Sequence, residues 1–161
     1  MNKTLWIMCG VPGSGKTWFA KNKLSRGSGW GYVSRDSIRF SIIKDNEDYF
    51  SHEDEVFETF VKTIVFMINY EGTNNIIADA THLNWSSRRK LLNALSKEID
   101  MGNVDVIPVF MEVKMKDILE RNNLREGRAQ VPEKTIYDMY NRMSNPERDP
   151  YNYTAVMKVK N

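Results

Sequence analysis

One stretch constrains this chain more than any other, a glycine-rich octapeptide at Gly10–Thr17 that reads GVPGSGKT. An apolar run, Leu5–Cys9, precedes it, and a segment with helical potential, Trp18–Leu24, follows it. The pattern G-x-x-x-x-G-K-[S/T] between a strand and a helix is that of a P-loop, whose backbone N–H groups converge on phosphate. The residues expected to hold a nucleotide and Mg²⁺ are Gly10, Pro12, Gly13, Ser14, Gly15, Lys16 and Thr17. The alternative is a glycine-rich turn that binds nothing.

Composition indicates an ordinary single-domain protein. The chain has 161 residues, of which 41% are hydrophobic and 27% are charged, as is usual for one globular domain. The formal net charge of +2 is too small to indicate nucleic-acid binding by itself. No apolar run approaches the ~18 residues of a membrane span, and the first strand begins too early for a signal peptide, so we expect a cytoplasmic protein without a membrane partner. Cys9 is the only cysteine, which excludes an internal disulfide and favours a small core residue.

The rest of the chain alternates predicted strands and helices. Strands are expected at Leu5–Cys9, Trp30–Ser34, Asn75–Asp79, Val104–Val113 and Ala155–Val159. Helices are expected at Trp18–Leu24, Ser37–Ile43, Glu53–Tyr70, Ser86–Asp100, Lys116–Arg125 and Glu133–Met143. This alternation predicts an α/β P-loop kinase fold, with about five parallel strands and helices on both faces. Because proline lacks an N–H group, Pro108 is expected to mark a bulge or a partial edge in the fourth strand.

Three local signals concern the starts of helices. Asp36 can cap the helix that follows the second strand, and Ser51–Asp54 resembles a capping box. Arg88, Arg89 and Lys90 place positive charge in the first turn of the fourth helix, where it opposes the helix dipole. That placement indicates an anionic partner, with a solvated helix face as the equal alternative.

Other charged residues lie where open α/β sheets bind ligands, outside the carboxyl ends of the strands. Asp36 and Arg39 follow the second strand, and a carboxylate there can accept the proton of an attacking hydroxyl while the arginine binds an anion. Asp79 ends the third strand as a Walker-B-like carboxylate would. Arg121 and Arg125 are spaced as in a lid over phosphates, with Arg128 nearby. Each charge also has a structural alternative: a helix cap, a turn cap or a solvated helix face.

Taken together, these motifs resemble the 5′-kinase domain of phage-type polynucleotide kinase over roughly residues 4–145. The matching stretches are GVPGSGKT, SRDSIR at 34–39, DAT at 79–81, Arg88-Arg89, and RN…R…VP at 121–132. The resemblance implies that the chain transfers the γ-phosphate of ATP, or another nucleoside triphosphate, to the 5′-hydroxyl ends of DNA or RNA with Mg²⁺. On the donor side, the resemblance implies that Lys16 and Thr17 bind phosphate and Mg²⁺ and that Arg121 and Arg125 contact the phosphates from a lid. On the acceptor side, it implies that Asp36 is the general base and that Arg39 binds the acceptor's 3′-phosphate. Asp79 and Thr81 are the implied further contacts with the acceptor.

The sequence departs from that family at two points. Thr17 stands where the family often has serine, which keeps the hydroxyl. Ala80 and His82 alter the pattern after Asp79, so the acceptor contacts there stay open, and a lone loop histidine is more often incidental. No D-x-D-x-T phosphatase motif occurs, so we expect a single P-loop kinase domain over residues 1–161, with a lid at about 116–131 and no phosphatase domain.

Two other functions stay open. A small-molecule kinase of the zeta-toxin, nucleoside or antibiotic type would have a similar architecture, and a non-catalytic ATP-binding module would bind nucleotide without transferring phosphate. No N-K-x-D motif is present, which disfavours a GTPase. Trp18, Trp30 and Trp85 are possible stacking platforms for bases, although core packing is the ordinary role of such residues.

Overall fold

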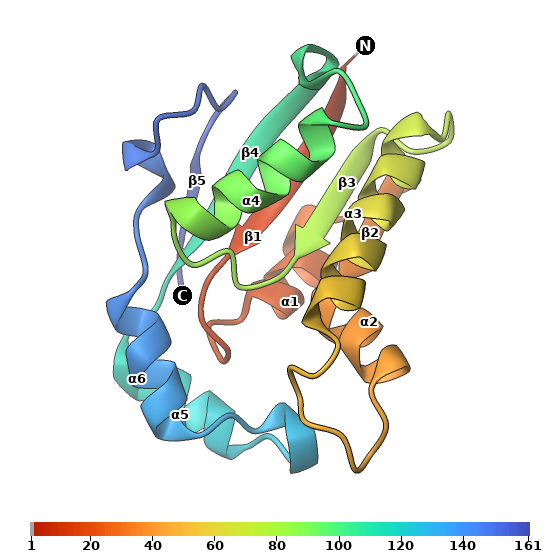
Figure 1. Ribbon diagram of the computed structural model, residues 1–161. Helices are drawn as coiled ribbons and strands as arrows, with labels where there is room; N and C mark the ends of the chain where they lie inside the picture. Colours follow the sequence, from red (N-terminus) through yellow and green to blue (C-terminus); the bar gives the residue numbers. More distant parts are fainter. Residues whose placement is uncertain (1) are drawn as a thin grey trace.

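A five-stranded parallel sheet forms the centre of the computed structural model, which describes residues 2–161 (Figure 1). The strands are β1 (Lys3–Cys9), β2 (Trp30–Ser34), β3 (Asn75–Asp79), β4 (Val104–Glu112) and β5 (Met157–Lys160). Their order is β2-β3-β1-β4-β5, and every neighbouring pair is parallel. The predicted α/β fold is confirmed. The fifth strand lies two residues later at its start than the sequence pattern indicates.

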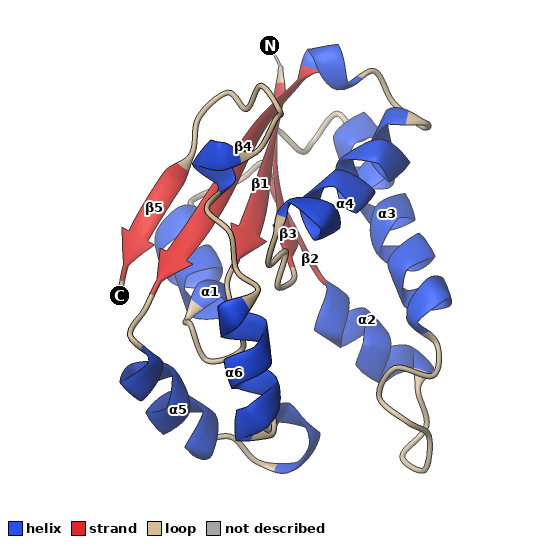
Figure 2. Cartoon of the chain, turned by 60° about the vertical axis from the view of Figure 1, so that its left-hand side comes forward, coloured by secondary structure: helices blue, strands red, loops and turns tan. Residues whose placement is uncertain are grey.

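Helices cover both faces of this sheet (Figure 2). They are α1 (Lys16–Phe19), α2 (Arg35–Ile42), α3 (Glu53–Asn69), α4 (Trp85–Ser96), α5 (Met115–Asn123) and α6 (Glu133–Asn141). One core cluster joins the sheet to α3 and α4, and a second joins the opposite face to α5, α6 and a π-helical turn (Ala20–Leu24) that continues α1. Beyond the carboxyl ends of the strands, α5 and α6 project together (Figure 1).

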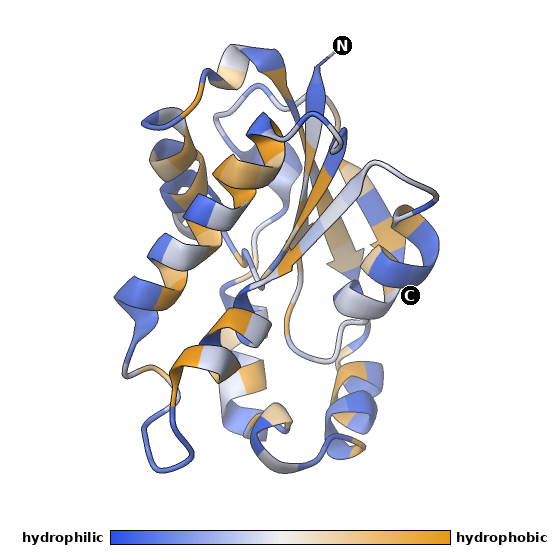
Figure 3. Cartoon of the chain, turned by 90° about the vertical axis from the view of Figure 1, so that its right-hand side faces the viewer, coloured by the Kyte–Doolittle hydropathy of each residue, from blue (hydrophilic) through white to orange (hydrophobic). Residues whose placement is uncertain are grey.

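The longest helix, α3, shows why these segments fold as they do. Its buried residues Val56, Phe60, Ile64 and Ile68 recur at helical spacing, so one stripe of the helix packs against the sheet and the other faces water. Figure 3 shows the resulting alternation of apolar and polar bands along the helices. Of the helices in residues 2–161, none combines the length and the apolar character that crossing a bilayer requires.

Pro108 occupies the position in β4 that its chemistry allows. It pairs with Ile7 of β1, but the pairing of β4 with β5 begins one residue later, at Val109 and Met157. On the β5 side the strand is therefore an edge at Pro108, where a missing N–H costs no ladder hydrogen bond. The expected partial edge is confirmed, and the carboxyl half of β4 remains free to pair on both sides.

Candidate active site

The octapeptide connects β1 to α1 and has the backbone of a phosphate-binding loop. Gly13 and Gly15 have φ values of +86° and +84°, in the left-handed region that favours glycine. A Cβ atom on Gly13 would lie 2.7 Å from the carbonyl oxygen of Ile118, so α5 packs directly on the loop. The Gly10 N–H donates to the carbonyl of Thr81 at 2.9 Å. The loop is thus fixed between the ends of β1, β3 and α5.

Two buried polar atoms around this loop have no protein partner within residues 2–161, the Ser14 hydroxyl and Nη1 of Arg121. Buried donors are normally satisfied, and Nη1 lies 3.4 Å from where a Cβ on Gly15 would stand. Both groups therefore border the same loop and are free to bind an anion. The donors suit a phosphate group, which is the ligand the motif predicts.

Charge converges on Lys16 from several elements. Burial lowers the pKa of Lys16 below its usual value, while the negative charges of Asp79 and Asp36 oppose that shift and Arg125 adds to it. The contacts of the chain give the same placement, because Asp79 accepts from Thr17 of the P-loop and pairs in the sheet with Ser34, two residues before Asp36. Asp36 and Asp79 therefore lie at the same edge of the sheet as the P-loop.

Asp79 is the point where the P-loop meets the sheet edge. Its Oδ2 accepts a hydrogen bond from the Thr17 hydroxyl at 2.7 Å and another from the Tyr32 hydroxyl. The pKa of Tyr32 is raised by burial and by this bond to the carboxylate. Among the described residues the Asp79 side chain bonds Thr17 and Tyr32 and does not cap the following turn. A hydroxyl and a carboxylate side by side are oxygen ligands of the kind Mg²⁺ takes, with phosphate and water completing its octahedron.

A second cluster lies at the start of α2 and α3. Arg39 is 5% exposed, and its guanidinium donates to Asp36, to the Tyr49 hydroxyl (2.8 Å) and to Oε1 of Glu53. The Tyr49 hydroxyl also donates to Asp36 at 2.7 Å, and Arg35 donates to the other Glu53 oxygen at 2.9 Å. Burial alone would raise the pKa of Glu53, but Arg39 and then Arg35 hold it below its usual value. Asp36 and Arg39 are therefore preorganised by one another and by α3.

Two of the expected helix caps are wrong. The side chain that caps α2 is Ser34, which accepts from the Ser37 N–H at 3.2 Å, so Asp36 has no capping role. Among the described residues no side chain caps α3, which has His52 at its N-cap position; the Ser51 hydroxyl donates instead to the carbonyl of Asp48 at 2.7 Å. Asp36 and Glu53 both bond Arg39 in place of capping a helix.

The turn after β3 is more constrained than a loop with an incidental histidine would be. His82 is buried with a φ of +38°, and its Nδ1 lies 2.8 Å from the carbonyl oxygen of Met8. Burial lowers its pKa to about 4, although the Met8 contact acts in the opposite direction. The neighbouring Thr81 is half-buried and bonds the P-loop through its carbonyl, as described above. The ring of His82 therefore ties this turn to β1.

The basic start of α4 does not form one exposed charge cluster. Arg88 is fully buried and forms a two-bond pair with Asp149, at 2.6 and 2.8 Å, while it also donates to the His82 carbonyl at 2.8 Å. Arg89 and Lys90 are exposed. For Arg88 the expected anionic partner is an internal carboxylate sixty-one residues away in sequence, and not a ligand.

The predicted lid arginines do not share a helix face. Arg121 lies on α5, but α5 ends at Asn123, and Arg125 follows it with a long bond (3.4 Å) to the carbonyl of Ala129. Neither arginine forms an ion pair within the described part of the chain, which leaves their charges available. Arg128 instead pairs with Asp45 at 3.3 Å and stacks over Phe40. The segment after α5 thus reaches across to the loop between α2 and α3.

Sequence patterns alone missed four residues of the site. Tyr32, Tyr49 and Glu53 contact predicted residues, and Asn161 donates to the Ser14 carbonyl at 3.4 Å. None belongs to a motif that indicates a ligand. Each is recognisable only from its partner, 10 to 147 residues away in the chain.

Comparison with solved structures gives the same architecture. A chain of the Pnkp1/Rnl/Hen1 RNA repair complex matches with a TM-score of 0.68 and 19% identity, over 88% of this chain and 44% of that one. A fungal RNA kinase matches with a TM-score of 0.66 and 12% identity, over 98% of this chain and 75% of that one. A sugar kinase from Janibacter sp. HTCC2649 matches with a TM-score of 0.61 and 16% identity, over 99% of this chain and 86% of that one. At these identities the likeness establishes the fold alone, and this chain spans less than half of the RNA repair protein.

A family model extends that conclusion. The model described as AAA domain (AAA_33) matches residues 5–146, which include the P-loop, both charged clusters and α6. The chain therefore belongs to this AAA domain family, as a nucleotide-binding P-loop domain with a kinase-type fold.

Proposed function

We propose that this protein is a polynucleotide 5′-hydroxyl kinase, which transfers the γ-phosphate of ATP to the 5′ ends of DNA or RNA. The observation that carries the proposal is the contact between the P-loop and Asp79: the Asp79 carboxylate accepts from the Thr17 hydroxyl at 2.7 Å, and it lies at the end of the strand that pairs with the one leading to Asp36. A P-loop alone indicates a triphosphate. A partly exposed carboxylate beside the transferring phosphate adds a candidate base for an attacking hydroxyl.

In this mechanism each half of the site has its own task. Lys16, with the free groups of Ser14 and Arg121, binds the ATP phosphates and offsets the charge that spreads over the γ-phosphoryl group in the transition state. Thr17 and Asp79 would hold Mg²⁺, which supplies further charge neutralisation when bound. Their existing hydrogen bond sets the two oxygens next to one another before any ligand arrives.

On the acceptor side, Asp36 takes the proton of the 5′-hydroxyl as it attacks in line. The side chain of Asp36 is 63% exposed, so a substrate hydroxyl can reach it. Arg39 and Thr81 are the proposed acceptor contacts, with Arg39 directed at a 3′-phosphate. The buried Nε of Arg35, which has no partner among the described residues, is a further donor beside them.

We also assign the segment at about residues 116–131 as the lid of a single kinase domain. Arg125 supplies a free charge from that segment, and the ion pair between Arg128 and Asp45 joins the segment to the loop between α2 and α3. Closure over both substrates would exclude water from the transferred phosphate.

A small-molecule kinase is the second candidate, because one observation favours it. Arg39 already has two carboxylate partners, Asp36 and Glu53, which reduces the positive charge available to an acceptor phosphate. A sugar kinase is among the solved structures with a similar fold.

The test is an acceptor screen with γ-labelled ATP and Mg²⁺. The acceptors are 5′-hydroxyl DNA, 5′-hydroxyl RNA, nucleoside 3′-monophosphates, free nucleosides and simple sugars. The proposal expects label on the nucleic-acid 5′ ends. Label on nucleosides or sugars alone would instead select the small-molecule kinase, and ATP binding without transfer to any hydroxyl would select a non-catalytic module.

A further inference from the structure

The first thirty-five residues contain six Lys or Arg residues and no Asp or Glu. Three of the six, Lys21, Lys23 and Arg26, lie together on and just after the π-helical turn that continues α1, and all three are exposed. Within residues 2–161 none of them forms an ion pair with a carboxylate. We call these three residues and the adjacent Trp18 the basic flank. Its charge is uncompensated on a protein whose net charge is only +2.

Aromatic rings alternate with these charges. The Trp18 ring is 56% exposed, and the Lys23 ammonium lies 5.6 Å from its centre. The Lys21 ammonium lies 4.9 Å from the centre of the Tyr32 ring. Exposed aromatic rings beside lysine and arginine are the usual platform for a single-stranded nucleic acid, because bases stack on the rings while the cations follow the phosphates.

The basic flank is continuous with the candidate active site. Tyr32 carries Lys21 on its ring and donates its hydroxyl to Asp79, while Trp18 directly follows Thr17 in the chain. Tyr32 of the edge strand β2 therefore links the basic flank to Asp79, one of the proposed acceptor contacts.

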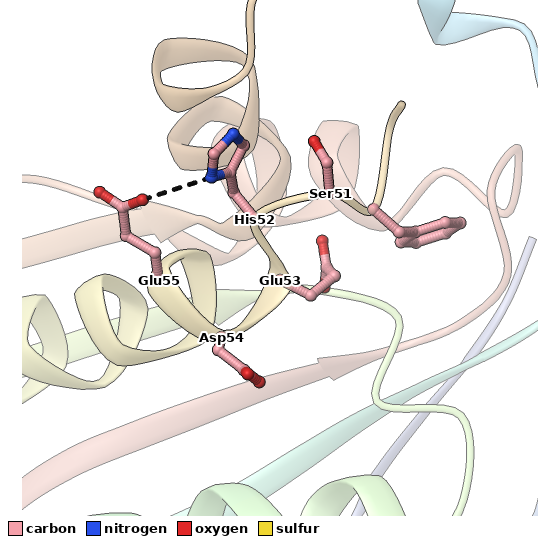
Figure 4. A pocket seen from close by; sticks show the side chains of 6 residues that line it. Ser51, His52, Glu53, Asp54 and Glu55 are labelled. Atoms are coloured by element: carbon pink, nitrogen blue, oxygen red, sulfur yellow. Dashed lines mark ion pairs between the residues drawn. The ribbon is translucent and has the colours of Figure 1, made fainter. Parts of the chain in front are cut away.

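The other side of the acceptor position carries the opposite charge. Residues 45–58 contain seven acidic residues and no Lys or Arg. Several line a cavity of about 320 Å³ at the start of α3, where Glu53, Asp54 and Glu55 lie around His52 (Figure 4). Beyond the one phosphate assigned to Arg39, a phosphate backbone is repelled from these carboxylates and attracted to the basic flank, since the potential near a surface follows the local charge and not the net charge.

We propose that the chain of an acceptor polynucleotide, beyond its 5′-terminal nucleotide, lies on the basic flank, with its phosphates at Lys21, Lys23 and Arg26 and a base on Trp18. This proposal rests on the proposed kinase function and names the part of the molecule that favours a polynucleotide over a mononucleotide. The ligand is single-stranded DNA or RNA, read through its backbone and stacking and not through its sequence.

The experiment compares two acceptors and two matched triple variants. The acceptors are a 5′-hydroxyl oligonucleotide of about twelve nucleotides and a nucleoside 3′-monophosphate. The first variant combines Lys21→Ala, Lys23→Ala and Arg26→Ala. The control removes the same charge from the exposed face of α4, with Arg89→Ala and Lys90→Ala, and from its C-cap, with Lys97→Ala. Far-UV circular dichroism melts verify that both variants fold.

The basic-flank variant should raise KM for the oligonucleotide about tenfold. It should also reduce the steepness of log(1/KM) plotted against log of the salt concentration by about 2, because each neutralised phosphate of a single strand contributes about 0.7 to that slope. KM for the nucleoside 3′-monophosphate should not change, and the α4 control should behave as wild type with both acceptors. Trp18→Ala should weaken oligonucleotide binding about fivefold or more. Equal KM values in wild type and the basic-flank variant, or a larger effect of the α4 control, would overturn the proposal.

A binding measurement separates failure of this surface from failure of the kinase function. Fluorescence anisotropy of the same oligonucleotide, labelled at its 3′ end, reports binding without phosphate transfer. Transfer to oligonucleotides together with unchanged anisotropy in the basic-flank variant overturns the surface alone. Absence of transfer to every 5′-hydroxyl acceptor overturns the kinase function. The proposed binding of the polynucleotide to the basic flank depends on that function and is then overturned as well.

Discussion

The phosphate-binding loop keeps polar groups unpaired, whereas the corner between α2 and α3 has its charges paired with one another. Around the loop, Ser14 and Arg121 each have a buried polar atom without a partner among residues 2–161. At the corner, Arg39 contacts Asp36, Tyr49 and Glu53 at once. The proposed donor side is thus open to an anion, and the proposed acceptor side is held in a preformed network.

This difference has a physical cause. Phosphate brings two or more negative charges, so a loop that binds it must supply donors that nothing else has neutralised. A catalytic carboxylate must instead be held in one position near a hydroxyl, and neighbouring charges and hydrogen bonds do that. We expect substitutions in the loop to affect ATP, and substitutions in the corner to affect the acceptor.

The largest effect is expected from Lys16→Ala. The substitution removes the ammonium group that the proposed mechanism places on the transferred phosphate, and phosphate transfer should fall by about 10²–10³-fold or more. The measurement is transfer of labelled γ-phosphate under saturating ATP, with the melting temperature as a folding control. A variant that keeps wild-type kcat and wild-type KM for ATP would show that this loop is not the donor site.

Asp36→Asn tests the corner between α2 and α3, and we expect the next largest loss of phosphate transfer from it. The amide keeps the shape and the hydrogen bond to Tyr49 but cannot accept the proton, so transfer should fall about 10²-fold. ATP affinity, measured by calorimetry, should stay at the wild-type value because Asp36 lies outside the loop. Full activity in this variant would remove Asp36 as the base.

The dependence of the free energy of unfolding on pH tests the turn after β3, which contains His82. The pKa of His82 is about 4 in the folded protein, against 6.5 for a histidine in the unfolded chain, so the unfolded chain binds a proton first as pH falls. Stability is therefore full above pH 6.5 and declines between pH 6.5 and 4. The free energy of unfolding should be lower by about 2 kcal/mol at about pH 5 than at about pH 7.5, in urea titrations.

His82→Asn should abolish most of that decline, since asparagine tolerates the positive φ without carrying a titrating ring. His52→Asn, which changes the other histidine, is the matched control and should leave the decline in place. An unchanged pH dependence in His82→Asn would contradict the role assigned to the buried ring.

The smallest effect is expected from Glu53→Gln. Arg39 loses one of its two carboxylates but keeps Asp36 and Tyr49, so the free energy of unfolding should fall by about 1–2 kcal/mol. KM for the acceptor should rise about fivefold, because Arg39 is less firmly held, while KM for ATP should not change. Glu58→Gln, on the exposed side of the same helix, is the control and should alter neither KM. An equal rise in both KM values for Glu53→Gln would contradict the separation of the two sides.

Most of the fold could be predicted because it depends on local patterns. The periods of apolar residues located all five strands and six helices within a few residues, and the alternation of strands and helices predicted a parallel sheet. The errors are at the polar ends of helices. Local patterns indicate a capping box at Ser51–Asp54 and a charged cluster that includes Arg88, whereas α3 has no such cap and Arg88 pairs with Asp149 from elsewhere in the chain.

The sequence alone determined the donor loop, because eight consecutive residues specify its backbone and its chemistry, and it also supplied Asp36, Arg39 and Asp79 as candidates. Only the tertiary structure decided what surrounds them. It brought Tyr49 and Glu53 to Arg39, Tyr32 to Asp79, and Asp149 to Arg88. The physical reason is that a contiguous motif acts through local backbone geometry, whereas an ion pair or a shared hydrogen bond depends on distance in space. Side chains far apart in the sequence meet only when the sheet and its helices have packed.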